Sequence, residues 1–345
     1  MMDVMIGVDP HKGSHTATML DRTERELTRI KVRAGRRQVA ELLEWANGHE
    51  ARTWAVEAAG GMGYLLSQQL VAAGETVLDV PATLASRVRV LSTGQSTKSD
   101  PNDARSVAVA ALRAPKLPPV RPADHVTVCR LLAKHHNDLA RWRNKLCCRL
   151  HALVAELVPG GIGKEVVVNQ ARLLLGDLQP DDAAAVERHR QAVELVDEIE
   201  RTDDLMGDSR ARIITAVEAS ATSLREVFGI GPIVACMLIG FSGDPTRFTT
   251  ASRYAAYTGT APIEFSSGGR IIHRLSRRGN RRLNHALHIV AITQLRYGHS
   301  PGRCYYDRKL AEGKTPREAV RSLKRRLSDV IWRHLVADAR RVTQR

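Results

Sequence analysis

The chain has 345 residues with 52 Lys and Arg against 37 Asp and Glu, which gives a formal net charge of +15. Its length suggests two or three domains, and 43% apolar residues exclude a mostly disordered chain. Five cysteines, an odd number, argue against a disulfide framework, and no apolar run reaches the ~20 residues of a membrane span. We therefore expect a cytoplasmic protein without a membrane partner.

The positive charge is concentrated at one end of the chain. Residues 241–345 hold 22 Lys and Arg against 7 Asp and Glu, whereas the first 240 residues are balanced. This asymmetry favours a polyanionic partner, because every neutralised phosphate releases counterions; a solvated basic face is the alternative. The charge pattern predicts that nucleic acid binds to the last third of the chain.

The first 113 residues alternate strands and helices. Short apolar segments predict strands at 4–9, 15–20, 27–32, 53–56 and 76–80. Helical patterns are found at 37–45, 64–73 and 103–112. Three early strands followed by alternating helix and strand indicate an α/β domain with a mixed sheet. A proline cluster at 115–122 then predicts a linker, because proline continues neither a helix nor a central strand.

Between the prolines and residue 222, apolar residues step by threes and fours. The stripe from Leu132 to Leu157 predicts a helix of about ten turns that stops at Pro159, and a second long helix is expected at 181–219. Helices so far above the ~11–12-residue mean indicate a protruding antiparallel coiled coil or dimerisation arm.

From residue 223 onward the pattern is helical and basic. The Gly229–Pro232 segment opens an apolar helix, and further helices are expected at 251–257 and 280–297. Thr315 is the expected N-cap of a final basic helix, since Pro316 follows it directly and Glu318 lies three residues on.

Four carboxylates lie at the ends of predicted elements in the first domain. Asp9 and Glu57 end strands, whereas Asp100 and Asp103 open a helix and share one of its faces. Ligands gather at strand ends of open α/β sheets, and oxygen ligands suit Mg²⁺ or Mn²⁺. The pattern predicts a site for two metal ions that clamps both oxygens of a phosphodiester displacement. Taken singly, each carboxylate also fits an ordinary turn, strand end or helix start.

With these residues the sequence resembles the DEDD transposases of bacterial insertion sequences, the group that includes the Piv invertase and the bridge-RNA-guided recombinases. The resemblance rests on the segments Ile6–Lys12, Glu57–Gly60, Lys98–Ala104, Gly229–Pro232 and Ser266–Leu283. It implies an RNase H-like (RuvC-like) α/β domain at 1–113, a linker and coiled-coil arm at 114–222, and a mainly helical transposase domain at 223–345.

The resemblance also implies roles for individual residues. Mg²⁺ or Mn²⁺ would be bound by Asp9, Glu57, Asp100 and Asp103. Ser267 would be the nucleophile that forms a covalent phosphoserine intermediate with DNA, with Ser266 as the alternative in register. The family further implies a guide RNA encoded by the element, action on element ends and target DNA in the bacterial nucleoid, and a homodimer or homotetramer.

Basic residues and glycines near these motifs are expected to hold the nucleic-acid backbone, which positions a duplex without reading its sequence. The expected contacts are Lys12, Gly229, Gly231, Arg274, Arg277, Arg278, Arg281, Arg282, Arg321, Lys324, Arg325, Arg326 and Arg333. For the two glycines, a plain tight turn is the alternative to a phosphate-binding helix N-terminus.

Two other functions fit parts of the pattern. An RNase H-like nuclease or junction resolvase would use the carboxylates with metal-activated water and no covalent serine. A non-catalytic nucleic-acid-binding protein would need only the basic C-terminal third. Because no Gly-x-x-x-x-Gly-Lys-Ser/Thr phosphate loop is present, an ATP-driven mechanism is not expected.

Overall fold

The computed structural model describes residues 4–93, 100–114, 116–267, 270–275 and 279–343, with the backbone alone at 91–93, 100, 264–267, 270–275 and 342–343. It divides into two compact units, Met1–Ala123 and Asp124–Arg345. The buried apolar clusters of the described residues lie within one unit or the other, so each unit has its own core.

The first unit is built on a five-stranded mixed sheet in the order β3-β2-β1-β4-β5. Its strands are β1 (Val4–Pro10), β2 (Ser14–Leu20), β3 (Glu26–Arg33), β4 (Arg52–Glu57) and β5 (Val77–Val80). The first three form an antiparallel meander, whereas β4 pairs parallel with both β1 and β5. This order is that of an RNase H-like sheet and confirms the predicted mixed α/β domain.

Helices cover both faces of this sheet. They are α1 (Gln38–Trp45), α2 (Tyr64–Ala72), α3 (Ala82–Thr93) and α4 (Asp100–Arg113). Successive strand residues point to opposite faces, so Trp54 joins the core beneath α1 and α2, and Ala55 joins the core beneath α3 and α4. α4 approaches β1 very closely, because a Cβ on Gly7 would lie 2.2 Å from the Ala104 carbonyl oxygen. The glycine therefore sets where α4 crosses the sheet.

The proline-rich segment runs along the edge of β5. The Asp79 N–H donates to the Pro118 carbonyl at 3.0 Å, and the Val120 N–H donates to the Val77 carbonyl at 2.8 Å. An extended prolyl segment suits a sheet edge, since proline has no N–H to donate to a further strand.

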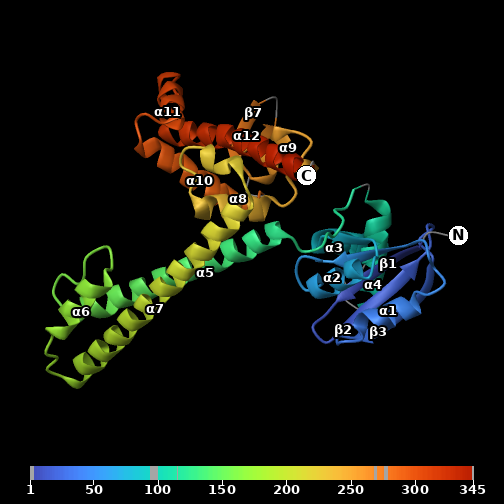
Figure 1. Ribbon diagram of the computed structural model, residues 1–345, viewed down its shortest axis with the longest axis horizontal. Helices are drawn as coiled ribbons and strands as arrows, with labels where there is room; N and C mark the ends of the chain where they lie inside the picture. Colours follow the sequence, from blue (N-terminus) through green and yellow to red (C-terminus); the bar gives the residue numbers. More distant parts are fainter. Residues whose placement is uncertain (1–3, 94–99, 115, 268–269, 276–278, 344–345) are drawn as a thin grey trace. The chain divides into compact units, whose positions relative to one another are not determined.

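Two long helices begin the second unit and run side by side (Figure 1). They are α5 (His125–Ala155) and α7 (Ala183–Ala219), and the short α6 (Val168–Gly176) lies near the end where the chain turns from one to the other. Asp124 and Asp182 cap the two helices by accepting from Thr127 and Ala185 backbone N–H groups. Both expected long helices are present, although α5 starts earlier and stops before Pro159.

The rest of the second unit is a mainly helical body. Its helices are α8 (Pro232–Ser242), α9 (Ala251–Tyr257), α10 (Arg281–Arg296), α11 (Pro301–Ala311) and α12 (Pro316–Thr343), with short 3₁₀ turns at Ser223–Glu226 and Pro245–Arg247. Thr315 caps α12 as predicted, with Glu318 bonded back to the Thr315 N–H at 2.9 Å. In the part of the chain that the structure describes, no helix is both long and apolar enough to cross a membrane.

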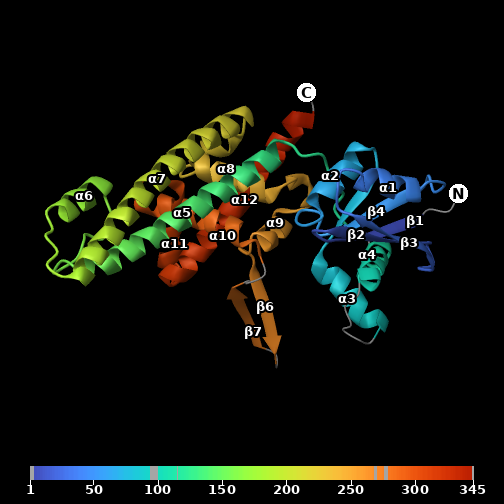
Figure 2. The same ribbon diagram turned by 90° about the horizontal axis from the view of Figure 1, so that it is seen from below.

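A β-hairpin, which was not predicted from the sequence, interrupts this helical body, and the body remains mainly helical as expected. Strands β6 (Pro262–Ser267) and β7 (Arg270–Leu275) pair antiparallel, with Ser267 opposite Arg270. Figure 2 shows the hairpin projecting from the helices around it. Apolar and polar residues alternate from Ile263 to Ser266, and β-branched isoleucines follow the Gly-Gly pair, a pattern that favours a hairpin over a helix here.

Candidate active site

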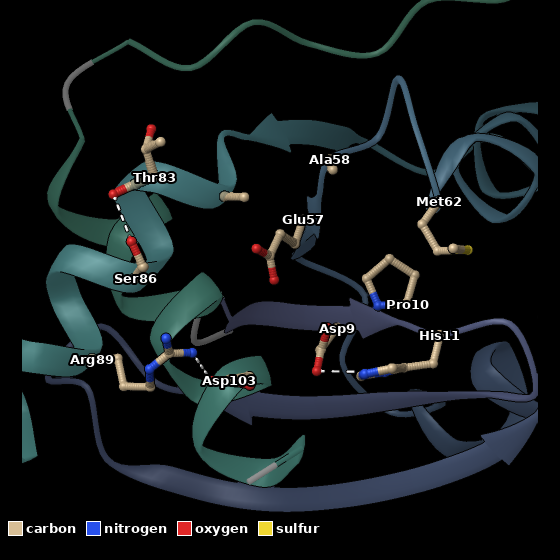
Figure 3. Close-up of a pocket in the computed structure, with 11 residues that line it drawn as sticks. Asp9, Pro10, His11, Glu57, Ala58, Met62, Thr83, Ser86, Arg89 and Asp103 are labelled. Atoms are coloured by element: carbon tan, nitrogen blue, oxygen red, sulfur yellow. Dashed lines mark hydrogen bonds and ion pairs between the residues drawn. The ribbon is translucent and has the colours of Figure 1, made fainter. Parts of the chain in front are cut away.

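Two of the predicted carboxylates lie at the carboxyl ends of adjacent parallel strands. Val8 of β1 pairs with Val56 of β4, so Asp9 and Glu57 each follow a paired residue and lie side by side. Asp9 is 7% exposed at the end of the buried strand β1. Figure 3 shows Glu57 pointing towards the middle of a cavity bordered by these strand ends and by α3.

Asp103 reaches the same cavity from α4. The close contact of α4 with β1 at Gly7 brings the first turn of the helix to the strand that carries Asp9. The cavity has a volume of about 520 Å³, and Asp9, Glu57 and Asp103 all line it. The fourth predicted carboxylate, Asp100, is the first residue of α4, and its side chain lies outside the described residues.

The turn after Glu57 is held in an uncommon backbone conformation. Ala58 has a positive φ of 48°, which costs a non-glycine residue about 1 kcal/mol. The Ala59 N–H donates to the Asp79 carboxylate at 2.9 Å, and the Ala58 N–H donates to the Val80 carbonyl at 2.9 Å. A Cβ on Gly63 would lie 2.6 Å from a Val56 methyl, so the glycine-rich turn folds back tightly onto β4. These contacts fix the direction in which Glu57 leaves the strand.

Two basic side chains accompany the carboxylates. Arg89 of α3 forms an ion pair with Asp103, and His11 Nδ1 lies 3.6 Å from Asp9 Oδ2 (Figure 3). The Arg89 and Asp103 side chains are 17% and 11% exposed, so their charges are only partly solvated. Sequence reasoning missed Arg89 because it predicted no helix at 82–93.

The donor set suits a hard divalent cation, because all three side chains offer carboxylate oxygens to one cavity. Among the described residues, no three His, Cys, Asp or Glu side chains are gathered closely enough to hold a metal ion. Asp103 is bonded to Arg89 instead. The guanidinium thus balances, in this structure, part of the negative charge around the cavity.

Two family models match the chain. Residues 6–159 match the DEDD transposase model of IS110, described as a transposase, and residues 221–307 match a model described as the transposase IS116/IS110/IS902 family. The 44.8 kDa protein of insertion element IS116 from Streptomyces clavuligerus is 29% identical over 95% of this chain and 94% of its own length. The chain belongs to the IS110/IS116 family of transposases.

Two further relatives are also a protein of an insertion element and a probable transposase. The 42 kDa protein of insertion element IS900 from Mycobacterium paratuberculosis is 28% identical, with 95% of this chain and 94% of the relative covered. A probable family 20 transposase from Pseudomonas aeruginosa is 28% identical over 80% of this chain and 79% of its own length. Among solved structures, T. thermophilus RuvC bound to a Holliday junction aligns over 34% of this chain and 99% of its own, with 19% identity and a TM-score of 0.28.

The predicted nucleophile of the transposase lies on the hairpin of the second unit. Ser266 pairs with Ile271 and Ser267 with Arg270, so both serines are in the last part of β6. Their side chains and residues 268–269 lie outside the described part of the chain. The role of either serine remains a prediction.

The residues of the transposase that are predicted to contact the nucleic-acid backbone differ in their exposure and in their partners. Lys12, Arg281, Arg321, Arg326 and Arg333 are exposed. Arg282 stacks on Phe241 with 4.8 Å between the guanidinium carbon and the ring centroid, and Arg325 is bonded to Asp329. The Arg274 side chain and residues Arg277 and Arg278 lie outside the described residues.

The two glycines before α8 have different backbone conformations. Gly229 has a φ of 85° and faces Thr293 of α10, which favours the alternative of a tight turn for this residue. Gly231 is the N-cap residue of α8, with an ordinary φ of −83°, and it is exposed. Phosphate binding by either glycine remains a prediction.

Proposed function

We propose that this transposase cuts and rejoins DNA at the cavity lined by Asp9, Glu57 and Asp103. The observation that carries the proposal is that three carboxylates from three separate elements line one cavity at the ends of parallel strands. Like charges so placed favour a bound cation, and strand ends are where open α/β sheets bind ligands.

Asp9, Glu57, Asp103 and Asp100 would hold the cation, Mg²⁺ or Mn²⁺, as two ions. When bound, such ions polarise phosphoryl oxygens and stabilise the charge of a phosphodiester displacement. The protein's own part is to hold the carboxylates: β1 and β4 fix Asp9 and Glu57, and α4 fixes Asp103. Arg89 is bonded to Asp103 in this structure, and it would compete with a cation for this carboxylate.

The covalent step uses the hydroxyl of Ser267, with Ser266 as the alternative. The serine Oγ forms a bond to phosphorus and loses its proton, while the bond from phosphorus to one deoxyribose oxygen breaks and that oxygen takes up a proton. The phosphoserine ester keeps the energy of the cut bond, so the reverse step rejoins a strand without ATP.

Target choice is delegated to an RNA encoded by the element. Exposed basic residues of α10 and α12, such as Arg281 and Arg321, suit contacts to phosphates, which carry no sequence information. Base pairing with an RNA would supply the sequence recognition that such contacts lack. Removing RNA from the purified transposase should then abolish site-specific cutting while DNA binding persists.

The active form is a homodimer or homotetramer assembled through the long helices. Large apolar side chains are exposed on α5, α6 and α7: Leu131 at 62%, Trp142 at 42%, Leu173 at 70% and Val186 at 52%. Apolar surface of this kind is stabilised by burial against a second copy. Light scattering should show a mass of two or four chains, and a monomer at all concentrations would contradict this.

The cleavage test uses a DNA duplex of the element end with Mg²⁺. Asp9→Asn and Glu57→Gln keep the side-chain size, remove a negative charge, and should abolish cutting while DNA binding is retained. Glu44→Gln, at an exposed position of α1, is the matched control and should cut normally. Normal cutting by Asp9→Asn would refute the carboxylate site, and binding without any cutting by the wild type would favour a non-catalytic nucleic-acid-binding protein.

The serine test separates the transposase mechanism from that of a water-using nuclease. Ser267→Ala should abolish both cutting and the covalent protein–DNA complex, whereas Ser266→Ala should retain both. Cutting that persists in both variants, with no covalent complex, would show that metal-activated water is the nucleophile.

A further inference from the structure

Three cationic side chains gather where α10 and α12 pack together. Lys324 of α12 donates from Nζ to Asn284 Oδ1 of α10 at 2.6 Å. Arg281 precedes Asn284 by three residues and Arg321 precedes Lys324 by three, so both guanidinium groups lie on the helix faces that meet at this bond. Both arginines are exposed, whereas Lys324 is partly buried.

The ammonium group is fixed in place by a polar network. The Asn284 amide nitrogen donates to the carbonyl oxygens of Thr258 and Gly259, at 3.0 and 3.1 Å, so its oxygen faces Lys324. A Cβ on Gly279 would lie only 2.3 Å from the Gly259 backbone nitrogen, so these two glycine segments touch. Gly259 and Gly279 flank the β6–β7 hairpin, and the cations therefore lie at its base.

The cluster carries an excess of positive charge, which Glu318 offsets only in part. Within the described residues, none of the three cations forms an ion pair, and the carboxylate near Arg321, Glu318, is bonded to the Thr315 N–H and hydroxyl. Burial, followed by the charges of Arg281 and Arg321, lowers the pKa of Lys324 to about 8. On α10, His288 also faces Lys324, and burial, then the charges of Lys324 and His285, lower the pKa of His288.

An anion stabilises such a cluster, and its shape favours a phosphodiester. Two guanidinium groups offer planar pairs of N–H donors to phosphate oxygens, and the ammonium supplies a compact charge beside them. The side chains are the donors here, because the Asn280 side chain already accepts from the Arg282 and Leu283 N–H groups at the start of α10.

We propose that Arg281, Arg321 and Lys324 form one binding site for a backbone phosphodiester of the nucleic acid at the base of the β6–β7 hairpin. The site deepens the proposed function and rests on it. A phosphate held here anchors the strand beside the hairpin that carries Ser267, and leaves the cut itself to other groups. The phosphodiester belongs to DNA or to the guide RNA, which offer the same chemistry.

The proposed site predicts that affinity for nucleic acid depends on pH, because Lys324 must be protonated to hold the phosphate. A bound phosphate raises the pKa of Lys324, so the wild-type protein takes up a proton on binding when the pH exceeds about 8. Affinity should fall about tenfold between pH 7 and pH 9, since the free ammonium loses its proton over this range. Lys324→Arg keeps the charge at all these pH values and should bind almost equally at pH 7 and pH 9.

The experiment measures fluorescence anisotropy of a labelled DNA duplex, and separately of an RNA of the same sequence, with the full-length protein. Arg281→Ala, Arg321→Ala and Lys324→Gln should each weaken binding and reduce the slope of log affinity against log salt by about one. The controls are Arg296→Ala and Arg340→Ala, at exposed positions near the ends of α10 and α12. Their affinity for the labelled nucleic acid should be closer to that of the wild type.

The outcomes separate the site from the proposed function. Loss with DNA alone or with RNA alone identifies the source of the phosphate and supports the site. Unchanged salt slopes in all three variants, or equal pH dependence of the wild type and Lys324→Arg, would overturn it, even if Lys324→Gln lowers thermal stability. Altered slopes in a protein that never cuts DNA would support the site and refute the proposed function.

Discussion

Arg89→Ala probes the electrostatics of the carboxylate cavity. Arg89 and Asp103 form an ion pair with side chains 17% and 11% exposed. Removing one partner of a buried pair costs about 3–5 kcal/mol, because the remaining charge stays desolvated. Since this pair keeps some access to solvent, we expect a loss of about 2–3 kcal/mol. For a unit the size of Met1–Ala123, this lowers the melting temperature by roughly 8–12 °C.

Divalent cations should reverse much of this loss. In the variant, Asp103 faces a cavity shared with Asp9 and Glu57 and no longer has its guanidinium partner. Mn²⁺ bound by these carboxylates replaces the missing positive charge, and it need not displace Arg89. Millimolar MnCl₂ should therefore raise the melting temperature of Arg89→Ala more than that of the wild type, measured by circular dichroism on the full-length protein.

Arg87→Ala is the matched control, because Arg87 is exposed on the same helix and the substitution is identical. It should change neither the melting temperature nor the response to Mn²⁺. Equal gains from Mn²⁺ in the wild type and in Arg89→Ala would refute the competition between Arg89 and a cation for Asp103. A melting temperature of Arg89→Ala equal to that of Arg87→Ala would refute the contribution of the ion pair to stability.

Three further substitutions test local features of the two units. Gly7→Ala places a methyl group against the Ala104 carbonyl and should lower the free energy of unfolding by about 3 kcal/mol in urea denaturation; a loss below about 1 kcal/mol would contradict the close approach of α4. Gly229→Ala forces a positive φ on alanine and should cost about 1–2 kcal/mol in the same assay, whereas no loss would contradict the left-handed turn. Glu75 accepts a hydrogen bond from Arg52, which lowers the Glu75 pKa, so the free energy of unfolding of the wild type should fall as the pH drops below about 5. Glu75→Gln should reduce this loss of stability at acid pH. An unchanged loss in the variant would contradict the pairing.

The sequence predicts best what depends on local patterns. Strands β1 to β5 follow from short apolar segments, and the cap at Thr315 follows from residue types three apart. The placement of Asp9 beside Glu57 was also predictable, because residues that follow parallel neighbouring strands meet at one sheet edge.

The remaining features depend on contacts between distant segments. The Arg89–Asp103 pair exists because α3 packs on α4, and nothing in the local sequence at 82–93 specifies that partner. Asp79 holds the turn after Glu57 from a neighbouring strand in the same way. The β6–β7 hairpin had a local signal, the alternation of Ile263 to Ser266 and the isoleucines that follow Gly-Gly, which the helical pattern on both sides outweighed.

The central claim is that the carboxylates of the first unit bind a divalent cation. Anomalous diffraction from crystals of the full-length transposase grown with Mn²⁺ and an element-end duplex tests it directly. We expect anomalous peaks within coordination distance of Asp9, Glu57 and Asp103, with the Arg89 guanidinium moved away from Asp103. A cavity without an anomalous peak at saturating Mn²⁺, with Arg89 still bonded to Asp103, would contradict the account.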